Sequence, residues 1–365
     1  MTQGLEVEGV SKSFGTEKVL RNINLTLGRG ETGVIVGPSG AGKTMLLNII
    51  AGLIKSDEGK VSIDGNVVEL GGSIHVKPAE RHVGYVFQDY LLFPHMTVFE
   101  NVAYGLKARH TPNKLIKEKV ENVLNISNLN DISEKKPAQI SGGQMQRVAL
   151  ARAIVLEPKL LLLDEPLSAL DRQTRETLRL ELRKIFDSLS ITVVHVTHDL
   201  DEAFLLGQKI GIIRSGELPF FGTKSDLFTH MTHSTAEFLG FNLMNAKLIR
   251  LEKSYYVFLV AGWRAEVKMY LLNKPNLTVG QDVTIAIPPE SIKISISQDE
   301  IHAGMYARIK EVWEFKNRVQ IVLEESDNRL VSEISNLEFR QYPLNRGDTV
   351  QITIDSALLL SEIPQ

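Results

Sequence analysis

One stretch of the sequence decides the fold, and it reads Gly37-Pro38-Ser39-Gly40-Ala41-Gly42-Lys43-Thr44. It fits the pattern G-x-x-x-x-G-K-[ST], follows an apolar run that ends at Val36, and precedes a helical pattern over 45–53. Glycines let a backbone fold tightly around phosphates, and the N–H groups of a helix start attract anions. We therefore expect Lys43 to neutralise the β and γ phosphates of a nucleotide and Thr44 to bind Mg²⁺. An ordinary glycine-rich turn is the alternative.

Two acidic residues end a second apolar run. Leu160 to Leu163 is followed directly by Asp164 and Glu165, and ligands bind at the carboxyl ends of the strands in open α/β sheets. Asp164 suits Mg²⁺, and Glu165 suits the activation of a water molecule. Carboxylates that merely end a strand are the alternative interpretation.

The first half of the chain alternates apolar runs with helical patterns, which predicts a mainly parallel sheet with helices on its faces. From Asp89 to Pro158 helical periodicity takes over, which indicates a helical insert of about 89–158. The predicted strand and helix pairs are Thr32 to Val36 with Lys43 to Leu53, His82 to Phe87 with Thr97 to Leu106, and Leu160 to Leu163 with Thr174 to Leu189; Ile191 to Val196 is a further strand.

Length and composition set outer limits. The 365 residues suit two or three domains, and 41 basic against 44 acidic residues give a net charge of −3. This balance disfavours nucleic acid as a partner. The lack of cysteine excludes disulfides and thiolate chemistry. No apolar run approaches the roughly 18 residues of a spanning helix, and Met1 to Phe14 holds no signal-like segment, so we expect a cytosolic chain.

The hydrophobic pattern of the sequence changes after about Leu239. Short runs rich in Val and Ile, separated by turn formers, predict an all-β domain over 239–365 behind an α/β domain over 1–238. The predicted strands are Tyr255 to Val260, Val283 to Ile287, Ile292 to Ile296, Arg318 to Leu323 and Asp348 to Ile354.

The segment Ser141-Gly142-Gly143-Gln144 discriminates among phosphate-loop proteins. Ser141 and Gln144 are spaced as a capping box at the start of a helix over 145–156. A helix start with two glycines can also close over a γ-phosphate presented by another subunit. With Met145-Gln146-Arg147, the segment resembles the signature of the ATP-binding cassette (ABC) family. The resemblance covers roughly 5–238 and meets the family's motifs in order.

The resemblance implies a role for further residues. Phe14 would stack on adenine, Gln88 would lie at the γ-phosphate and Mg²⁺, and His198 would hold the γ-phosphate and the water. Ser168-Ala169-Leu170-Asp171 would bridge two nucleotide sites. Taken singly, Phe14 is a packing aromatic, Gln88 a loop amide and His198 the end of a strand. Taken together, they imply a homodimer that sandwiches two ATP molecules and hydrolyses them with Glu165, Gln88 and His198 as catalytic groups.

The resemblance also implies partners. Importer cassettes lie at the cytoplasmic face of the membrane, dock on separate membrane subunits and act indirectly with an extracytoplasmic solute-binding protein. The stretch 87–98 is similar to the loop that receives the membrane subunit, and Tyr90, Leu92 and Phe93 would line its apolar groove, with the core of the helical insert as the alternative. Met45 departs from the family, where a second hydroxyl residue is common, so a contact to the α-phosphate is expected to be missing.

The tail resembles oligonucleotide-binding-like (TOBE or Mop-type) modules. Ile287-Pro288-Pro289-Glu290 is similar to their hydrophobic-Arg-Pro-Glu turn, with Pro288 where Arg is usual, and 329–358 is similar to molybdate-binding repeats. This favours import of molybdate or tungstate; sulfate, sugar, polyamine or iron are the alternatives. An oxyanion would need donors such as Ser335, Lys310 or Arg318, whereas Glu338 would repel it. The tail would otherwise serve dimerisation or regulation.

A second class of function shares the nucleotide motifs: soluble ABC ATPases of DNA repair or translation. Those proteins usually carry a coiled-coil insertion or a second cassette, and the sequence contains neither. The fold class expected is thus an α/β P-loop NTPase with a helical subdomain, followed by an all-β domain of the oligonucleotide-binding type.

Overall fold

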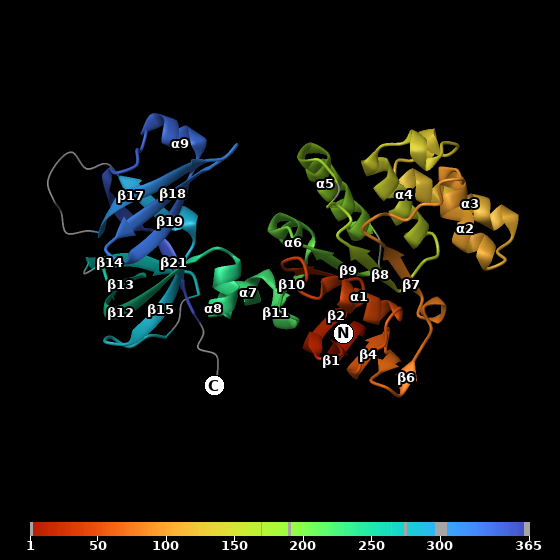
Figure 1. The fold of residues 1–365 in the computed structure, drawn as a ribbon, viewed down its shortest axis with the longest axis horizontal. Helices are drawn as coiled ribbons and strands as arrows, with labels where there is room; N and C mark the ends of the chain where they lie inside the picture. The colour runs from red at the N-terminus through yellow and green to blue at the C-terminus, as the bar shows by residue number, and fades with distance from the viewer. Residues whose placement is uncertain are drawn as a thin grey trace. The chain divides into compact units, whose positions relative to one another are not determined.

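The computed structural model describes residues 3–168, 170–188, 191–263, 265–273, 276–295 and 305–360. The chain divides into an N-terminal unit, Met1–Lys224, and a C-terminal unit, Ser225–Gln365 (Figure 1). The sequence places the domain boundary fourteen residues later, after 238. Residues 225–238 go with the C-terminal unit because Met231 and Ala236 form one apolar cluster with Ala286 and Leu358.

A mainly parallel sheet forms the centre of the N-terminal unit, as the alternating pattern predicts. Its strand order is β11-β10-β3-β9-β8-β7, and only β11 runs antiparallel to its neighbour. Every residue of β3, β8 and β9 is buried, which explains their unbroken apolar runs. The strands are β3 (Thr32–Val36), β7 (Val83–Val86), β8 (Leu160–Asp164), β9 (Thr192–Thr197), β10 (Lys209–Arg214) and β11 (Glu217–Thr223).

A second, antiparallel sheet of order β2-β1-β4-β5-β6 was not predicted from the sequence. Register shifts interrupt the pairing of β1 with β2, for example between Val7 and Val10, so the period-two pattern that marks a strand is broken. Its apolar face shares a core with α1 and the parallel sheet. The strands are β1 (Gln3–Phe14), β2 (Glu17–Gly28), β4 (Glu58–Ile63), β5 (Asn66–Leu70) and β6 (Ile74–His75).

The helical insert is confirmed, and Figure 1 shows its helices grouped at one end of the N-terminal unit. Helix α4 starts three residues before the predicted 145 because Ser141 caps it. The predicted end of α5, Leu189, lies outside the described residues. The insert holds helices α2 (Val98–Ala108), α3 (Asn113–Ile126) and α4 (Gly142–Ile154) and the short 3-10 turns η2 (Asn130–Ile132) and η3 (Pro137–Gln139). The other helical elements of the N-terminal unit are α1 (Lys43–Ala51), α5 (Arg172–Ser188), α6 (Leu200–Leu206) and the 3-10 turn η1 (Pro78–Glu80).

The C-terminal unit is built from strands, as expected. Strands β12-β13-β14-β21-β15 close a barrel, and β16-β20-β17-β18-β19 form a sheet that shares its core. All five predicted strands are present; Ile296 lies outside the described residues. The elements are α7 (Lys224–Thr229), α8 (His233–Phe238), β12 (Asn242–Glu252), β13 (Tyr255–Val260), β14 (Ala265–Leu271), β15 (Asp282–Ile287), η4 (Pro289–Ser291), β16 (Ile292–Ser295), β17 (Met305–Glu314), β18 (Val319–Glu325), β19 (Asn328–Ile334), α9 (Asn336–Gln341), β20 (Thr349–Ile354) and β21 (Ser356–Leu359).

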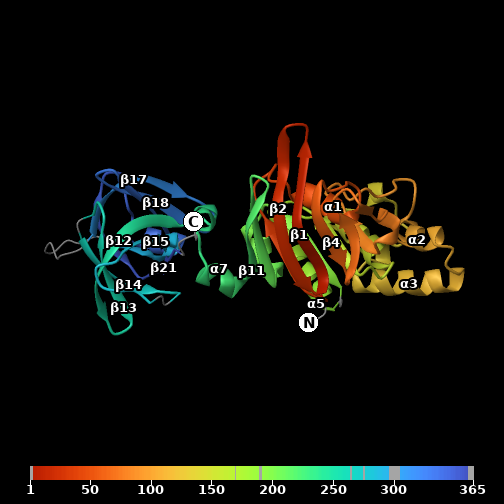
Figure 2. The ribbon, with the colours of Figure 1, turned by 90° about the horizontal axis from the view of Figure 1, so that it is seen from below.

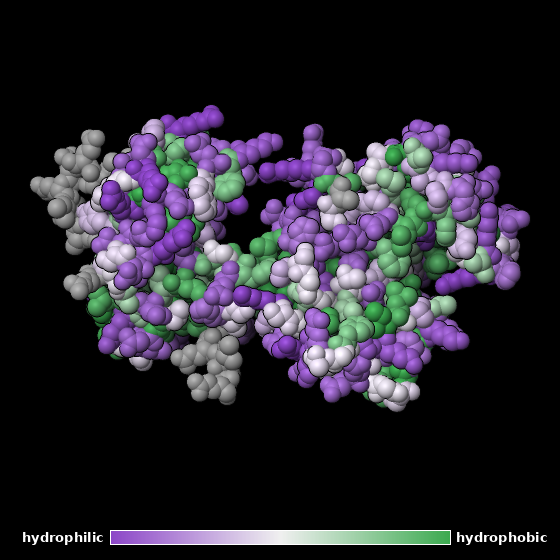
Figure 3. All heavy atoms as spheres, in the orientation of Figure 1, coloured by the Kyte–Doolittle hydropathy of each residue, from purple (hydrophilic) through white to green (hydrophobic). Residues whose placement is uncertain are grey.

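The surface is mostly polar on the face drawn in Figure 3, and apolar side chains reach it over α4 and β7. Within the described ranges, no helix has both the length and the apolar character needed to cross a membrane.

Candidate nucleotide-binding site

The glycine-rich loop joins buried β3 to α1, as its motif predicts. Gly37 has no room for a side chain, because a Cβ there would lie 2.2 Å from the carbonyl oxygen of Ile213. Gly42 caps α1 with a φ of 103°, a left-handed conformation that suits glycine. Pro38, Ser39 and Gly40 are exposed, whereas Ala41 is buried. The loop thus exposes its middle and anchors both ends.

Lys43 lies inside this loop. Its side chain is only 4% exposed, and its Nζ donates to the carbonyl oxygens of Gly37 at 2.9 Å and Pro38 at 3.0 Å. The same ammonium is 3.1 Å from Oε1 of Glu165. The anion-binding loop therefore surrounds a buried ammonium group. This group is paired with the carboxylate of Glu165, which directly follows β8.

Asp164 is linked to both flanking elements. Its Oδ1 accepts from the Thr44 hydroxyl at 3.0 Å, and Tyr85 Oη lies 3.4 Å from its Oδ2 and 3.2 Å from Oδ1 of Asn48. Burial raises the pKa of Asp164, and the charge of Glu165 adds to this effect. Burial, helped by Asp164, also raises the pKa of Tyr85, so the phenol stays protonated. The Thr44 hydroxyl beside the buried Asp164 carboxylate is a donor set that fits Mg²⁺.

Glu165 is held between Lys43 and His198. Its Oε2 lies 2.9 Å from His198 Nδ1, opposite the contact of Oε1 with Lys43. Burial opposes ionisation, but the hydrogen bonds of His198 and Lys43 outweigh it and lower the pKa of Glu165. Its backbone adopts a φ of 43°, uncommon for a residue with a side chain. Glu165 is therefore a carboxylate kept ionised in a fixed position.

Gln88 lies on the same edge of the sheet. Strand β7 pairs in parallel with β8, with Val86 opposite Leu163, so Gln88 and Glu165 follow their strands at equivalent places. Gln88 is exposed. The structure thus brings together Lys43, Thr44, Asp164, Glu165 and His198 by direct contacts, and adds Gln88 by register. Such a set can bind a polyphosphate, hold a divalent cation and polarise a water molecule.

Phe14 lies apart from this group, at the tip of the long hairpin of β1 and β2, which Figure 2 shows extending from the N-terminal unit. It is 52% exposed, which does not fit a packing aromatic. Strand β2 passes the phosphate loop, because a Cβ on Gly42 would meet Leu20 at 2.6 Å and the Val19 carbonyl at 3.1 Å. Phe14 pairs with Glu17 across the hairpin. Glu17 and Val19 are two residues apart in β2, which corresponds to about 7 Å along the strand.

The segment 141–144 starts α4 in the helical insert. Both halves of the predicted capping box are present: Gln144 N donates to Ser141 Oγ at 3.3 Å, and Ser141 N donates to Gln144 Oε1 at 2.9 Å. Gly142 and Gly143 let α4 approach Leu170 and α5, since a Cβ on Gly143 would lie 3.1 Å from Leu178. Asp171 caps α5 by accepting from Thr174 N at 3.1 Å; Ala169 lies outside the described residues.

The loop after β7 corrects one expectation. Tyr90 is only 7% exposed, and its hydroxyl donates to the carbonyl oxygen of Pro166 at 3.1 Å, so it does not line a surface groove. Leu91 is instead 55% exposed. Arg152 of α4 donates to the carbonyl oxygens of Leu91 and Tyr90 at 2.7 and 2.8 Å. Buried Asn101 holds the far end of the loop through Phe93.

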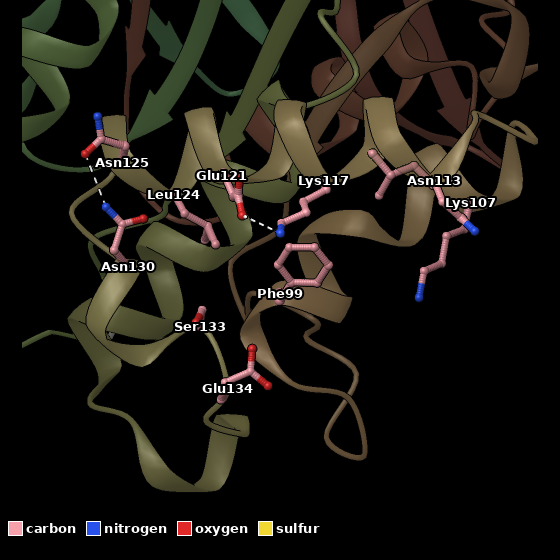
Figure 4. A pocket seen from close by; sticks show the side chains of 11 residues that line it. Phe99, Lys107, Asn113, Lys117, Glu121, Leu124, Asn125, Asn130, Ser133 and Glu134 are labelled. Atoms are coloured by element: carbon pink, nitrogen blue, oxygen red, sulfur yellow. Dashed lines mark hydrogen bonds and ion pairs between the residues drawn. The ribbon is translucent and has the colours of Figure 1, made fainter.

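An open pocket of about 780 Å³ lies in the helical insert, between α2, α3 and the segment 130–134. Figure 4 shows Phe99 beside the ion pair of Lys117 with Glu121, whose charged atoms are 3.8 Å apart. Asn130 donates to Asn125 at 3.2 Å on another side. The pocket is therefore lined by a mixture of apolar, polar and charged side chains.

The groups named for an oxyanion in the C-terminal unit pair with their neighbours. Ser335 Oγ accepts from Glu338 N at 3.1 Å and caps α9. Lys310 is paired with Glu324, and Arg318 Nη1 lies 3.3 Å from Oε2 of Glu333. Ile309, the residue before Lys310, pairs with Leu323, and Arg318 precedes Val319, so about four residues of β18 separate Lys310 from Arg318. The described contacts therefore give no convergent set of donors there.

This fold and this site define a P-loop ATPase with a helical insert. The family model "ABC transporter" matches residues 20–168. A sulfate/thiosulfate import ATP-binding protein of Bacillus cereus is 38% identical over 356 residues, which cover 95% of each chain. A spermidine/putrescine import ATP-binding protein of Vibrio vulnificus is 35% identical over 358 residues, 96% of this chain and 92% of that one.

A solved relative agrees with this likeness. The ATP-binding cassette MJ0796, solved as a dimer bound to ADP and phosphate, is 34% identical with a TM-score of 0.52 and covers 60% of this chain and 98% of that one. The chain belongs to the ABC transporter family, as an ATP-hydrolysing subunit of the importer type. The predictions of the family and the fold class are confirmed.

Sequence reasoning missed two residues beside this site. Tyr85 reaches Asp164, and Lys12 lies 5.4 Å from the centre of the Phe14 ring. Tyr85 stands inside a short apolar strand and Lys12 inside a strand that was not predicted, so neither carried a signal in the sequence.

Proposed function

We propose that the cluster at the carboxyl edge of β3, β8 and β9 hydrolyses ATP by direct attack of water. Lys43 and the N–H groups of 37–44 would hold the triphosphate. Glu165 would take the proton of the water while its oxygen bonds to the γ-phosphorus and the bond to the β,γ-bridging oxygen breaks. His198 would orient Glu165 and the γ-phosphate. The proposal depends above all on Glu165, held ionised between Lys43 and His198.

Mg²⁺ would be held by Thr44, Asp164 and Gln88. Thr44 and Asp164 already lie within 3.0 Å of each other, and Gln88 follows the neighbouring strand. When bound, the ion supplies charge neutralisation for the phosphate oxygens. Tyr85 would fix the orientation of the Asp164 carboxyl through its other oxygen.

Each ATP would be completed by a second copy of the chain. Ser141, Gly142, Gly143 and Gln144 start α4 in the helical insert and would close on the γ-phosphate bound by the partner, with Asp171 near the second nucleotide. The likeness to a cassette solved as a dimer supports this arrangement. A homodimer with two shared sites makes the isolated chain nearly inactive.

The membrane subunits would dock on the helical insert from the cytoplasmic face, with a solute-binding protein acting only through them. The 780 Å³ pocket supports this, because it opens directly after the loop of 87–98: Phe99 N donates to the carbonyl oxygen of Ser133 at 2.9 Å. Its mixture of apolar and charged groups suits one face of an amphipathic helix. Because the chain has no cysteine, single cysteines at Phe99 and Glu121 can be crosslinked to the membrane subunits without background.

The transported solute would be sulfate or thiosulfate. The sulfate/thiosulfate relative matches 95% of the chain at 38% identity, including the C-terminal unit. A polyamine is the second candidate, because the spermidine/putrescine relative covers 96% of the chain at 35% identity. Molybdate or tungstate finds no support in these relatives, although sulfate shares the shape and charge of both.

One experiment tests the solute. The transporter is purified as a complete complex, and its ATPase rate is measured with sulfate, thiosulfate, molybdate and spermidine, each with the solute-binding protein of that complex. We expect sulfate or thiosulfate to stimulate turnover and spermidine to leave it unchanged. Stimulation by spermidine alone would assign the second candidate.

A further inference from the structure

Lys12 packs against the aromatic ring that the proposed function assigns to adenine. Its Nζ lies over the Phe14 ring, 5.4 Å from the ring centre. The Lys12 side chain is 13% exposed, whereas Phe14 is 52% exposed. One face of the ring is therefore covered by a largely buried cation, and much of the rest of the ring remains open to a ligand.

Asp57, at the approach to β4, fixes this cation. Its Oδ1 accepts from Lys12 Nζ at 2.6 Å, and its Oδ2 accepts from Ser13 N at 2.7 Å. The backbone N–H of Asp57 donates in turn to the carbonyl oxygen of Ser11 at 3.0 Å. The carboxylate thus clamps 11–13, the stretch that leads to Phe14, and holds the ammonium in one place.

The ring is also placed at a suitable distance from the phosphate loop. Val19 and Leu20 of β2 contact Gly42, and Arg21 N and Gly216 N connect this strand to Ala41 through bonds of 2.8 and 3.2 Å. From Val19 the hairpin extends about 7 Å further to the pair of Glu17 and Phe14. A ring there can meet the base of a nucleotide whose phosphates lie at Lys43.

We propose that Lys12 is a positioning residue for the nucleobase: held by Asp57, it fixes the Phe14 ring and makes the open face of that ring a stronger platform for adenine. The ammonium draws on the electron density of the ring by a cation–π contact. An electron-poorer ring stacks more strongly on an electron-rich base. This inference rests on the proposed role of Phe14.

The test compares ATP with inorganic tripolyphosphate, which has the phosphates but no base. Calorimetry on the full chain measures both affinities for the wild type and for Lys12→Met, which keeps the length of the side chain and removes its charge. We expect the affinity for ATP to fall about threefold, and that for tripolyphosphate to stay unchanged. Lys12→Arg should retain the ATP affinity, because a guanidinium also pairs with a carboxylate and a ring.

A double-mutant cycle separates this inference from the proposed function. In a Phe14→Ala background, Lys12→Met should weaken ATP binding no further. An equal loss for ATP and tripolyphosphate, or no loss for ATP, overturns the role of Lys12. If Phe14→Ala itself leaves ATP affinity unchanged, the role of Phe14 fails instead. Thermal unfolding of each variant shows whether folding contributes to a loss.

Discussion

Charged groups are arranged differently in the two units. In the N-terminal unit, Lys43, Asp164, Glu165 and His198 come from the ends of two strands and the start of a helix, and they converge at one sheet edge. In the C-terminal unit, ion pairs join strands of the same sheet that are adjacent, as in Lys310 with Glu324, or separated by one strand, as in Arg250 with Glu266. Convergence leaves groups that a ligand can complete, whereas local pairing satisfies each group in place.

The two units also differ in the surroundings of two serine residues that cap helices. Ser141 and Ser335 each accept from the backbone N–H three residues on, at 3.3 and 3.1 Å. Helix α4 has 13 residues and begins with two glycines, whereas α9 has only 6 residues and carries a carboxylate at Glu338 in its first turn. A capping box by itself therefore predicts a helix start, and its surroundings decide whether it has a further use.

The largest effect should come from Glu165→Gln. The amide keeps the shape of the carboxyl but cannot accept the proton of the water, so steady-state ATPase turnover should fall about a hundredfold or more. ATP should still bind, and the variant should accumulate as an ATP-bound dimer in size-exclusion chromatography. A turnover within tenfold of the wild type would remove Glu165 from its assigned role.

The serine caps provide the next test. Ser141→Ala and Ser335→Ala should each cost about 1 kcal/mol or less of stability, because both lose a cap. Only Ser141→Ala should also lower ATPase turnover, by about tenfold, because only that serine is proposed to meet a phosphate. Equal turnover in the two variants would mean that Ser141 is a cap and nothing more.

Phe14→Ala should change affinity rather than chemistry. Loss of stacking on the base should weaken ATP binding about tenfold, while turnover at saturating ATP stays close to the wild type, since stacking is equal in the ground and transition states. Calorimetry with ADP, which carries the same base, measures the loss of stacking, and initial rates at saturating ATP measure turnover. Unchanged ADP affinity would return Phe14 to the role of a surface aromatic.

The smallest effect concerns pH and compares Glu202 with Glu252. Burial opposes ionisation of Glu202, yet its hydrogen bond with His195 at 3.0 Å and the charge of Arg179 lower its pKa. A lowered pKa adds stability above the unfolded value of about 4.3, which is lost as pH falls through the folded pKa. Glu202→Gln should therefore reduce the loss of stability between about pH 5 and pH 3.

Glu252 is the matched control, because Arg250 and Lys268 lower its pKa at a site where its side chain is 36% exposed. Glu252→Gln should leave the acid unfolding profile nearly unchanged, since solvent screens exposed pairs. Urea unfolding at several pH values measures both variants. Identical profiles for the two would contradict the contrast between buried and exposed pairing.

Most elements that have a regular hydrophobic pattern or a known motif could be predicted from the sequence. The parallel strands, the phosphate loop, the helical insert and the strands of the C-terminal unit all follow from apolar runs and motif spacing. The antiparallel sheet was missed because bulges in β1 break its alternation. Tyr90 was expected in a surface groove, with a core position as the alternative, and the structure buries it with its hydroxyl bonded to the carbonyl oxygen of Pro166. An aromatic residue in a loop gives the same sequence pattern in both cases. Lys12 and Tyr85 depend on contacts between elements that no local pattern encodes.

The central claim is that each ATP site combines the 37–44 loop and Glu165 of one copy with Ser141 of another. Glu165→Gln and Ser141→Arg each disable both sites of a homodimer. When the two inactive variants are mixed before ATP is added, a mixed dimer keeps one intact site, so ATPase activity should return to about a quarter of the wild-type rate at equal amounts. A mixture no more active than its separate components would contradict a site shared between two copies.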